Sequence, residues 1–367
     1  TRLVTTEAAL ADALEACARV SAVAVDTEFM RTNTYYPVAG LLQLSDGATC
    51  WLVDPLAVDI RPAARLFADA SVVKVLHACS EDLEVFATSV GELPEPLYDT
   101  QVAAAVLGDG YSLSYQALIE NELGVTLAKD QTRSDWLARP LTERQLHYAA
   151  QDVYYLVRAF GKQQERLGER ADWIREECAG LAQTPLSAAD PGEAYLRIKG
   201  AWKLLPEELH VLRETARWRE SFARDNDVPR NRVAEDASLL AIAKGADSKN
   251  ALSRAGMHPR ALRKYANALL EAGAAARRET PAQLPEALPR PAPANSNALM
   301  KRLKAHVARE AERLGIETQI LATRRHLEAL LRTRDDSGRV TLPESLAGWR
   351  RELIGESLAA IANGENS

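Results

Sequence analysis

The chain has 367 residues, 47% of them hydrophobic and 26% charged, which is ordinary for a globular protein of two or three domains. No apolar run approaches the roughly 18 residues that cross a bilayer, and the N-terminus lacks the pattern of a secretion signal, so neither a membrane nor a secreted protein is expected. The four cysteines stand singly with no C-x-x-C pair, which indicates reduced thiols in the cytoplasm rather than disulfides or a zinc site.

The formal net charge of -6 hides a difference between the two parts of the chain. Residues 1–195 hold 15 Lys and Arg against 29 Asp and Glu, whereas residues 196–367 hold 30 against 22. A basic rear part can attract a polyanion while an acidic front part holds cations for chemistry. Ordinary variation between charged helix surfaces is the alternative.

Helical and strand patterns alternate in the front part. Thr5 or Thr6 can cap a helix that continues to about residue 19. An apolar strand over 23–30 follows, and then strands over 41–44 and 49–53 joined by a Ser-Asp-Gly turn, so an antiparallel meander is predicted.

Further helices and strands follow the meander, and together they predict an α/β domain with a mixed sheet. The predicted strands lie at 72–76 and 97–98, and the predicted helices at 62–69, 80–89, 100–107, 112–123 and 142–168.

The strand over 23–30 carries two acids, Asp26 and Glu28. Side chains alternate along a strand, so both carboxylates point to one side of the sheet. Unpaired buried charge costs several kcal/mol, so a cation must meet these acids. A divalent metal ion is one possibility, and a salt bridge to Lys or Arg is the other.

Two more acids recur downstream at useful positions. Ser80 is a natural N-cap, which places Asp82 in the first turn of a helix at the end of the sheet where ligands bind in α/β folds. Tyr148 and Asp152 are four residues apart and share one face of a predicted helix. Together the four acids predict a site for two divalent ions.

The order D-T-E, H-x-x-x-x-D-L and Y-x-x-x-D resembles the three exonuclease motifs of the DEDD superfamily, in its tyrosine branch. The runs over 26–29, 31–37, 76–86 and 133–141 are similar to bacterial ribonuclease D, and the likeness extends over essentially the whole chain. This resemblance implies an RNase H-like fold and a hydrolase that degrades RNA from its 3′ end and releases nucleoside 5′-monophosphates.

The resemblance also implies a role for each motif residue. Asp26 would bridge two Mg²⁺ or Mn²⁺ ions, Glu28 and Asp152 would hold the ion on the nucleophile side, and Asp82 would support the other. Tyr148 would position the attacking water. These five are the expected catalytic residues, and the four acids are the expected metal ligands.

Four other residues are weaker candidates for RNA contact. Phe29 could stack on the terminal base, and His77 could touch a phosphate, although core packing explains either residue as well. Arg133 and Trp136 lie in a predicted loop where a cation and an indole could grip single-stranded RNA.

The rear part is helical and resembles two copies of the HRDC domain that follows the nuclease in ribonuclease D. Arg213, Arg217, Arg219 and Arg224 in the first copy, and a Lys/Arg cluster over 301–313 in the second, could bind phosphates. The expected domains are an exonuclease, a connector, an HRDC domain, a proline-rich linker and a divergent HRDC-like domain: 1–182, 183–196, 197–280, 281–296 and 297–367.

Three functions are compatible with these observations. The first is a 3′-exoribonuclease that trims tRNA precursors and other structured RNAs with single-stranded 3′ tails. The second is a DNA 3′-5′ exonuclease of the same superfamily, since no residue visibly reads the 2′-hydroxyl. The third is a non-catalytic RNA-binding protein on a nuclease scaffold, although no carboxylate is lost. A monomer without an obligate protein partner suffices for each.

Overall fold

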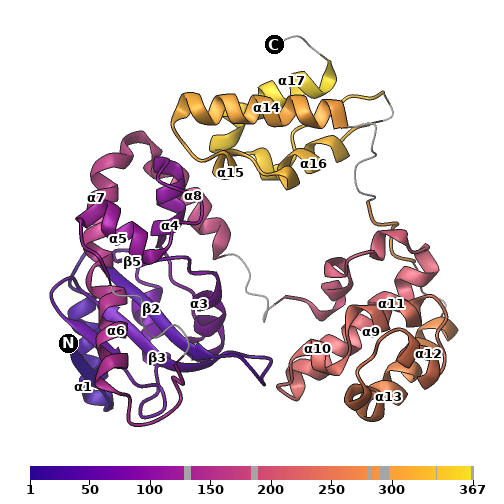
Figure 1. Cartoon of the computed structure of the whole chain (residues 1–367), viewed down its shortest axis with the longest axis horizontal. Coiled ribbons are helices and arrows are strands. Elements are labelled where there is room, and N and C mark those ends of the chain that lie inside the picture. Colours follow the sequence, from indigo (N-terminus) through magenta and orange to yellow (C-terminus); the bar gives the residue numbers. More distant parts are fainter. Residues whose placement is uncertain are drawn as a thin grey trace. The chain divides into compact units, whose positions relative to one another are not determined.

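A computed structural model describes most of the chain and divides it into two compact units (Figure 1). Unit 1 comprises residues 1–30, 38–185 and 292–367, and unit 2 comprises residues 31–37 and 186–291. The structure describes residues 1–127, 134–182, 189–279, 281, 283–289, 297–335 and 337–364. Arg133, part of the predicted connector and much of the predicted linker lie outside these ranges.

A six-stranded mixed sheet forms the centre of unit 1. The sequence predicted a mixed sheet and five of these strands, but not the short first strand β1. The strand order is β1-β4-β3-β2-β5-β6, with the predicted meander as the antiparallel run β2-β3-β4 and β5 parallel to β2 and to β6. The strands are β1 (Arg2–Val4), β2 (Ala22–Met30), β3 (Val38–Ser45), β4 (Cys50–Val53), β5 (Val73–Leu76) and β6 (Leu97–Asp99).

The unequal lengths of β2 and β5 create an opening in the sheet. β5 pairs only with Ala22–Ala24, whereas β3 pairs along β2 as far as Met30. The second half of β2 therefore has a strand on one side only. α3 (Ser80–Val85) begins beyond the end of β5, which is where ligands bind in α/β folds.

Eight helices of the exonuclease part surround this sheet in the described residues. Thr6 caps the first as predicted, because its hydroxyl accepts the N–H of Ala9 at 3.3 Å. The predicted helix over 142–168 is instead two helices separated at Tyr155. Besides α3, the helices are α1 (Glu7–Cys17), α2 (Ala64–Phe67), α4 (Thr100–Leu107), α5 (Tyr115–Leu123), α6 (Glu143–Tyr154), α7 (Leu156–Leu167) and α8 (Ala171–Leu181).

The C-terminal helices pack against the exonuclease part and belong to unit 1. The rings of Trp173 and Trp349 stack with their centres 4.9 Å apart, and Arg350 forms an ion pair with Glu177. The peptide N–H of Glu317 donates to a carbonyl of α4 at 2.9 Å. The helices are α14 (Asn297–Leu314), α15 (Thr318–Leu321), α16 (Arg324–Arg332) and α17 (Glu356–Asn363).

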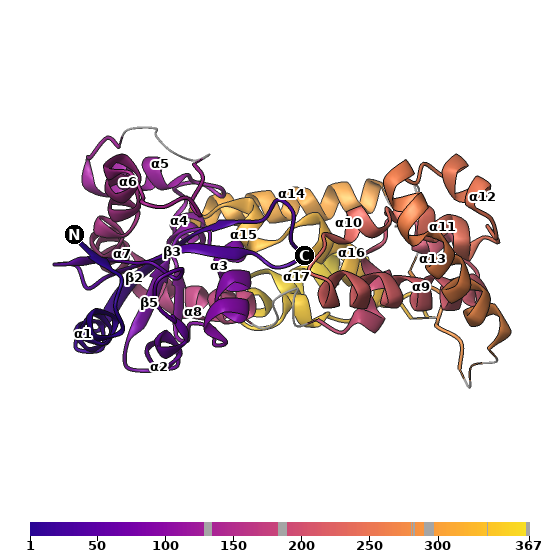
Figure 2. The ribbon, with the colours of Figure 1, turned by 90° about the horizontal axis from the view of Figure 1, so that it is seen from below.

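Unit 2 is a helical bundle (Figure 2). It has an apolar core of its own. Within the described parts of both units, no helix combines the length and the apolar character needed to cross a membrane. The main helices of unit 2 are α9 (Pro206–Asp225), α10 (Arg230–Val233), α11 (Asp236–Ala243), α12 (Lys249–Arg254) and α13 (Pro259–Arg278).

The segment 31–37, which joins β2 to β3 in the chain, is part of unit 2. Its Tyr35 is 4% exposed and belongs to the core of the bundle. The Tyr35 hydroxyl donates to the fully buried Glu220, and the peptide N–H groups of Tyr35 and Tyr36 donate to Asp227 at 2.8 and 3.0 Å. The segment is thereby anchored by both its side chains and its backbone.

The ion pair between Arg350 and Glu177 should stabilise the docking of the C-terminal helices. Arg350→Ala removes this pair and the bonds that the guanidinium donates to the carbonyls of Ile320 at 2.8 Å and Leu321 at 3.0 Å. Since it leaves Glu177 partly buried without its partner, we expect urea denaturation to give a free energy of unfolding lower by about 3 kcal/mol. The neighbouring Arg351 is the control.

Arg351→Ala removes an exposed ion pair with Glu356 at 3.9 Å, so it should change the free energy of unfolding by less than about 0.5 kcal/mol. Equal stability of the two variants would contradict a stabilising role of the Arg350 pair.

Candidate active site

Three of the predicted acids meet in front of the sheet. One carboxylate oxygen from each of Asp26, Glu28 and Asp152 lies within 4.8 Å of the others. The first two come from β2 and the third from α6, which packs across β2, β3 and β4. Strand alternation places the first pair on one side, and the helix supplies the third oxygen.

Local sequence determines where α6 starts and which face it buries. The Thr142 hydroxyl accepts the N–H of Gln145 at 3.2 Å, and the Gln145 side chain accepts the N–H of Thr142 at 3.0 Å. This capping box fixes the first turn. Ala149 and Val153 are fully buried, so the adjacent face of the helix carries Tyr148 and Asp152.

The fourth acid, Asp82, lies outside this group of three but close to it. Thr27 lies between Asp26 and Glu28 on β2, and its hydroxyl donates a hydrogen bond to the Asp82 carboxylate. Asp82 is 8% exposed, and its charge raises the pKa of Asp26. The site therefore contains a compact trio of carboxylates and a neighbouring fourth one.

The start of α3 differs from the prediction that Ser80 caps it. Ser80 is the first helical residue, and Cys79 before it makes no capping bond through its side chain. Asp99 holds the turn instead, because its carboxylate accepts the N–H groups of Ala78 at 3.1 Å and Cys79 at 2.9 Å. Ala78 has a left-handed φ of 57°, a costly conformation that these bonds support.

The four carboxyl groups have raised pKa values, so their ionisation is unfavourable. Burial, followed by repulsion from neighbouring carboxylates, raises the pKa of Glu28 to about 9 and holds the pKa of Asp26 well above its usual value. Burial raises the pKa values of Asp82 and Asp152 to about 7. Among the described residues no Lys or Arg forms an ion pair with any of the four acids. The salt bridge that the sequence left open as an alternative is therefore not observed in this part of the chain.

Gln43 is a site residue that the sequence interpretation missed. It is fully buried, lies opposite Asp26 in the register of β2 and β3, and its Nε2 donates to Asp26 at 3.3 Å. Its Oε1 is buried without a hydrogen-bond partner. The signal was a lone amide in an apolar strand, next to the acidic strand of the predicted meander.

Tyr148 borders the acids and keeps its proton at neutral pH. Burial, followed by the negative charges of Asp152 and Glu28, raises the pKa of Tyr148 above its usual value. Its hydroxyl hydrogen-bonds to Asp152, which favours the ionised carboxylate. The Trp136 ring lies 6.2 Å away, centre to centre, and helps to fix the phenol.

The weaker candidates have varied surroundings. Both ring nitrogens of His77 are engaged, with the Thr100 hydroxyl at 2.9 Å and the Leu113 carbonyl at 3.0 Å, as a structural histidine would be. Phe29 is partly buried and packs against the core. Trp136 is 3% exposed and offers little surface to RNA.

Comparisons with protein-family models assign the parts of the chain. Residues 1–167 match a 3′-5′ exonuclease domain, and residues 208–272 match an HRDC domain. Residues 296–358 match the C-terminal HRDC domain of ribonuclease D.

Similar proteins cover nearly the whole chain. A ribonuclease D of Pseudomonas paraeruginosa is 47% identical over 92% of this chain and 90% of its own length. A ribonuclease D of Escherichia coli is 38% identical over 97% of each chain. A crystal structure of Escherichia coli RNase D, described as an exoribonuclease involved in structured RNA processing, aligns with a TM-score of 0.89 at 36% identity, over 100% of this chain and 99% of that one.

Without divalent cations, the stability of the protein should fall as the pH rises. The folded protein keeps protons on Glu28 and Asp152 up to pKa values of about 9 and 7, whereas the unfolded chain releases them near pH 4. Their stabilising contribution is complete below about pH 4 and is lost as the pH rises through the folded-state values. Urea denaturation in chelator should give a loss of several kcal/mol, about 6 at most, between about pH 5.5 and 8.5.

The control for this pH dependence is Asp152→Asn. It removes one titrating group and its repulsion of Glu28, so the loss of stability with pH should be smaller than in the parent. Parallel profiles would show that the acidic cluster does not cause the dependence.

Proposed function

The chain belongs to the ribonuclease D family and is a 3′-5′ exoribonuclease, and we propose that its acidic cluster performs the hydrolysis with two divalent cations. The observation that carries this proposal is the trio Asp26, Glu28 and Asp152, whose oxygens lie within 4.8 Å of one another without a basic partner among the described residues. Such a group needs external cations to neutralise it when it ionises.

The donor set fits Mg²⁺ or Mn²⁺, because all the candidate ligands are carboxylate oxygens. Glu28 and Asp152 would hold one ion together with Asp26. Asp82, kept in place by Thr27, would hold the second ion, with Asp26 shared between the two. When bound, a pair of such ions activates water and neutralises charge on the leaving 3′-oxygen.

The chain's own residues orient the reactants. Tyr148 keeps its proton, so it can donate a hydrogen bond to a water or a phosphate oxygen but cannot act as a general base at neutral pH. Its bond to Asp152 and the adjacent Trp136 ring restrict where the hydroxyl points. We assign Tyr148 the role of positioning the attacking water.

The substrates we propose are tRNA precursors and other small structured RNAs with single-stranded 3′ tails, cut to nucleoside 5′-monophosphates by a monomer in the cytoplasm. The similar Escherichia coli enzyme is described as acting in structured RNA processing, which supports this class. The four cysteines are buried free thiols, the state that a reducing compartment maintains.

A 5′-labelled RNA hairpin with a single-stranded 3′ tail tests the proposed function. With Mg²⁺ or Mn²⁺ the parent should shorten the RNA from its 3′ end, spare the matching DNA hairpin, and stop when chelator is added. Asp26→Asn should lower the rate at least about a thousandfold, because it removes the shared carboxylate. Asp12→Asn, at an exposed position on α1, should keep the parent rate.

Hydrolysis that persists in chelator, or in Asp26→Asn, would contradict a metal-dependent site at these acids. Equal hydrolysis of the DNA hairpin would favour the DNA exonuclease alternative over selectivity for RNA.

Tyr148→Phe should lower kcat about a hundredfold while the RNA dissociation constant, measured in chelator, changes less than twofold, because only the hydroxyl that orients the water is lost. Tyr111→Phe, at an exposed position, is the control. A Tyr148→Phe enzyme with the parent kcat would refute the assigned role.

A further inference from the structure

Three of the predicted phosphate-binding arginines of α9 donate hydrogen bonds to other residues of unit 2. Arg219 is 4% exposed and donates to Asp236 at 2.8 Å and to the carbonyl of Ala234 at 3.0 Å. Arg224 donates to the Tyr35 hydroxyl at 3.1 Å. Arg219 and Arg224 therefore serve contacts inside unit 2.

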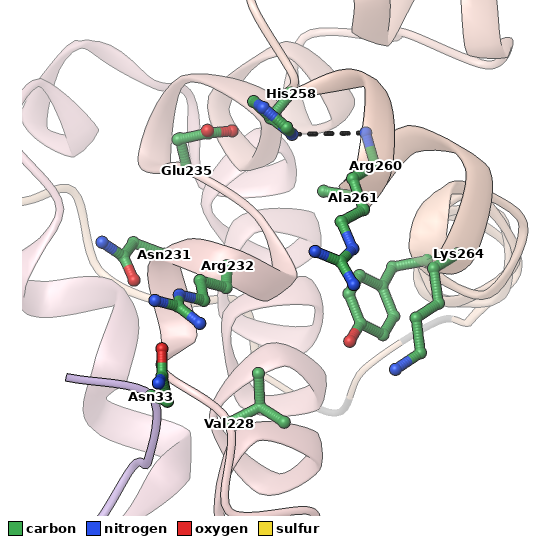
Figure 3. A pocket seen from close by; sticks show the side chains of 10 residues that line it. Asn33, Val228, Asn231, Arg232, Glu235, His258, Arg260, Ala261 and Lys264 are labelled. Atoms are coloured by element: carbon green, nitrogen blue, oxygen red, sulfur yellow. Dashed lines mark hydrogen bonds between the residues drawn. The ribbon is translucent and has the colours of Figure 1, made fainter. Parts of the chain in front are cut away.

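A cavity of about 600 Å³ in unit 2 carries exposed cations on its walls (Figure 3). Asn33 comes from the segment 31–37, Arg232 from α10, and Arg260 and Lys264 from the first turns of α13. The three basic side chains are exposed, and we call this cavity the basic pocket. Its volume lies within the range typical of small-molecule sites.

Hydrogen-bond donors dominate the lining around these cations. His258 accepts the N–H of Arg260 through Nδ1 at 3.2 Å, so its Nε2 is the ring nitrogen left to donate (Figure 3). Glu235 is the one acid among the residues that line the pocket. An anion with several acceptor oxygens, such as a phosphodiester, matches this set.

Glu235 does not offer its buried oxygen to a ligand. Its Oε2 has no hydrogen-bond partner and is closed to solvent, so a molecule in the pocket cannot reach it. The contacts of an anionic ligand are therefore those with the exposed basic side chains.

An adjoining cavity extends the cationic lining beyond one phosphate. It has a volume of about 460 Å³, shares Asn231 and Arg232 with the basic pocket, and adds Arg31 and Arg230. Cations that continue from one cavity into the next suit a strand with successive phosphates better than a single free nucleotide.

The wall contributed by the segment 31–37 is held firmly. The Arg232 guanidinium donates to the carbonyl of Thr32 at 3.0 Å, and Tyr35 is anchored in the core of the bundle. Asn33 therefore keeps its position beside Arg232, and little ordering is needed when a ligand enters.

We propose that the basic pocket binds one nucleotide of a single-stranded RNA segment, with the phosphates on its Arg and Lys side chains. The choice of RNA as the polyanion rests on the proposed function. Since Asn33 belongs to the segment that follows β2 in the chain, the exonuclease sequence itself completes this nucleotide site.

Binding of a labelled, unstructured oligoribonucleotide to the full chain tests the proposal. Fluorescence anisotropy in chelator, at several salt concentrations, measures affinity without hydrolysis. Arg260→Gln/Lys264→Gln removes two cations of the basic pocket, and Lys249→Gln/Arg254→Gln removes two exposed cations of α12 outside it. Circular dichroism and thermal unfolding verify that each variant is folded.

We expect Arg260→Gln/Lys264→Gln to weaken RNA binding at least about tenfold and to reduce the slope of log affinity against log salt by about 1.4, the loss of two phosphate contacts. Lys249→Gln/Arg254→Gln should change the affinity less than twofold. Asn33→Asp, which adds a negative charge to the pocket, should weaken binding more than Asn250→Asp on α12 does.

Equal affinities and salt slopes for the two double variants would overturn the proposal and leave the pocket to an anionic protein partner. A separate hydrolysis assay on the parent keeps the two proposals distinguishable. If the parent hydrolyses RNA while the double variants bind alike, the nucleotide site fails alone. If the parent binds through the pocket but does not hydrolyse, the proposed function fails alone.

Discussion

The rest of unit 1 must hold Asp26, Glu28, Asp82 and Asp152 close together although their carboxylates repel one another when ionised. Burial, followed by the charges of Asp82, Asp152 and Glu28, raises the pKa of Asp26, and no basic side chain among the described residues pairs with the four acids. The fold must hold these groups together at a cost, because buried like charges oppose folding. A central strand, a capped helix packed across it and a turn held by Asp99 provide the rigidity, and cations bound from solution would relieve the strain.

Local patterns were sufficient to predict the elements that carry the acids. Strand alternation put Asp26 and Glu28 on one side, and helical spacing put Tyr148 with Asp152. The residues that hold these groups were harder to predict, because they act across long stretches of sequence. Asp82 receives its bond from Thr27, 55 residues away, and Asp99 supports Ala78 across 21 residues. Only the register of the sheet brings Gln43 opposite Asp26.

The grouping of segments into units also depends on such distant pairs. The segment 31–37 is anchored in the helical bundle by Tyr35 and Glu220, 185 residues apart. The C-terminal helices join the exonuclease through Trp349 and Arg350. Composition and periodicity carry no signal for a tyrosine that docks on one buried carboxylate, since the partner is defined by shape and charge in three dimensions.

The basic pocket beside the segment 31–37 gives a structural interpretation of the difference in charge between the two parts of the chain. An acidic exonuclease sequence attracts cations but repels a phosphate backbone, so affinity for RNA has to come from basic side chains elsewhere. The sequence predicted that basic clusters of the helical domains bind phosphates. The structure shows that some of their arginines, such as Arg219 and Arg224 of α9, form contacts inside unit 2. The exposed cations of α10 and α13 remain available, in a pocket that Asn33 helps to line. Asn33 follows β2 in the chain, so a polyanion bound there would contact a side chain a few residues along the sequence from Asp26 and Glu28.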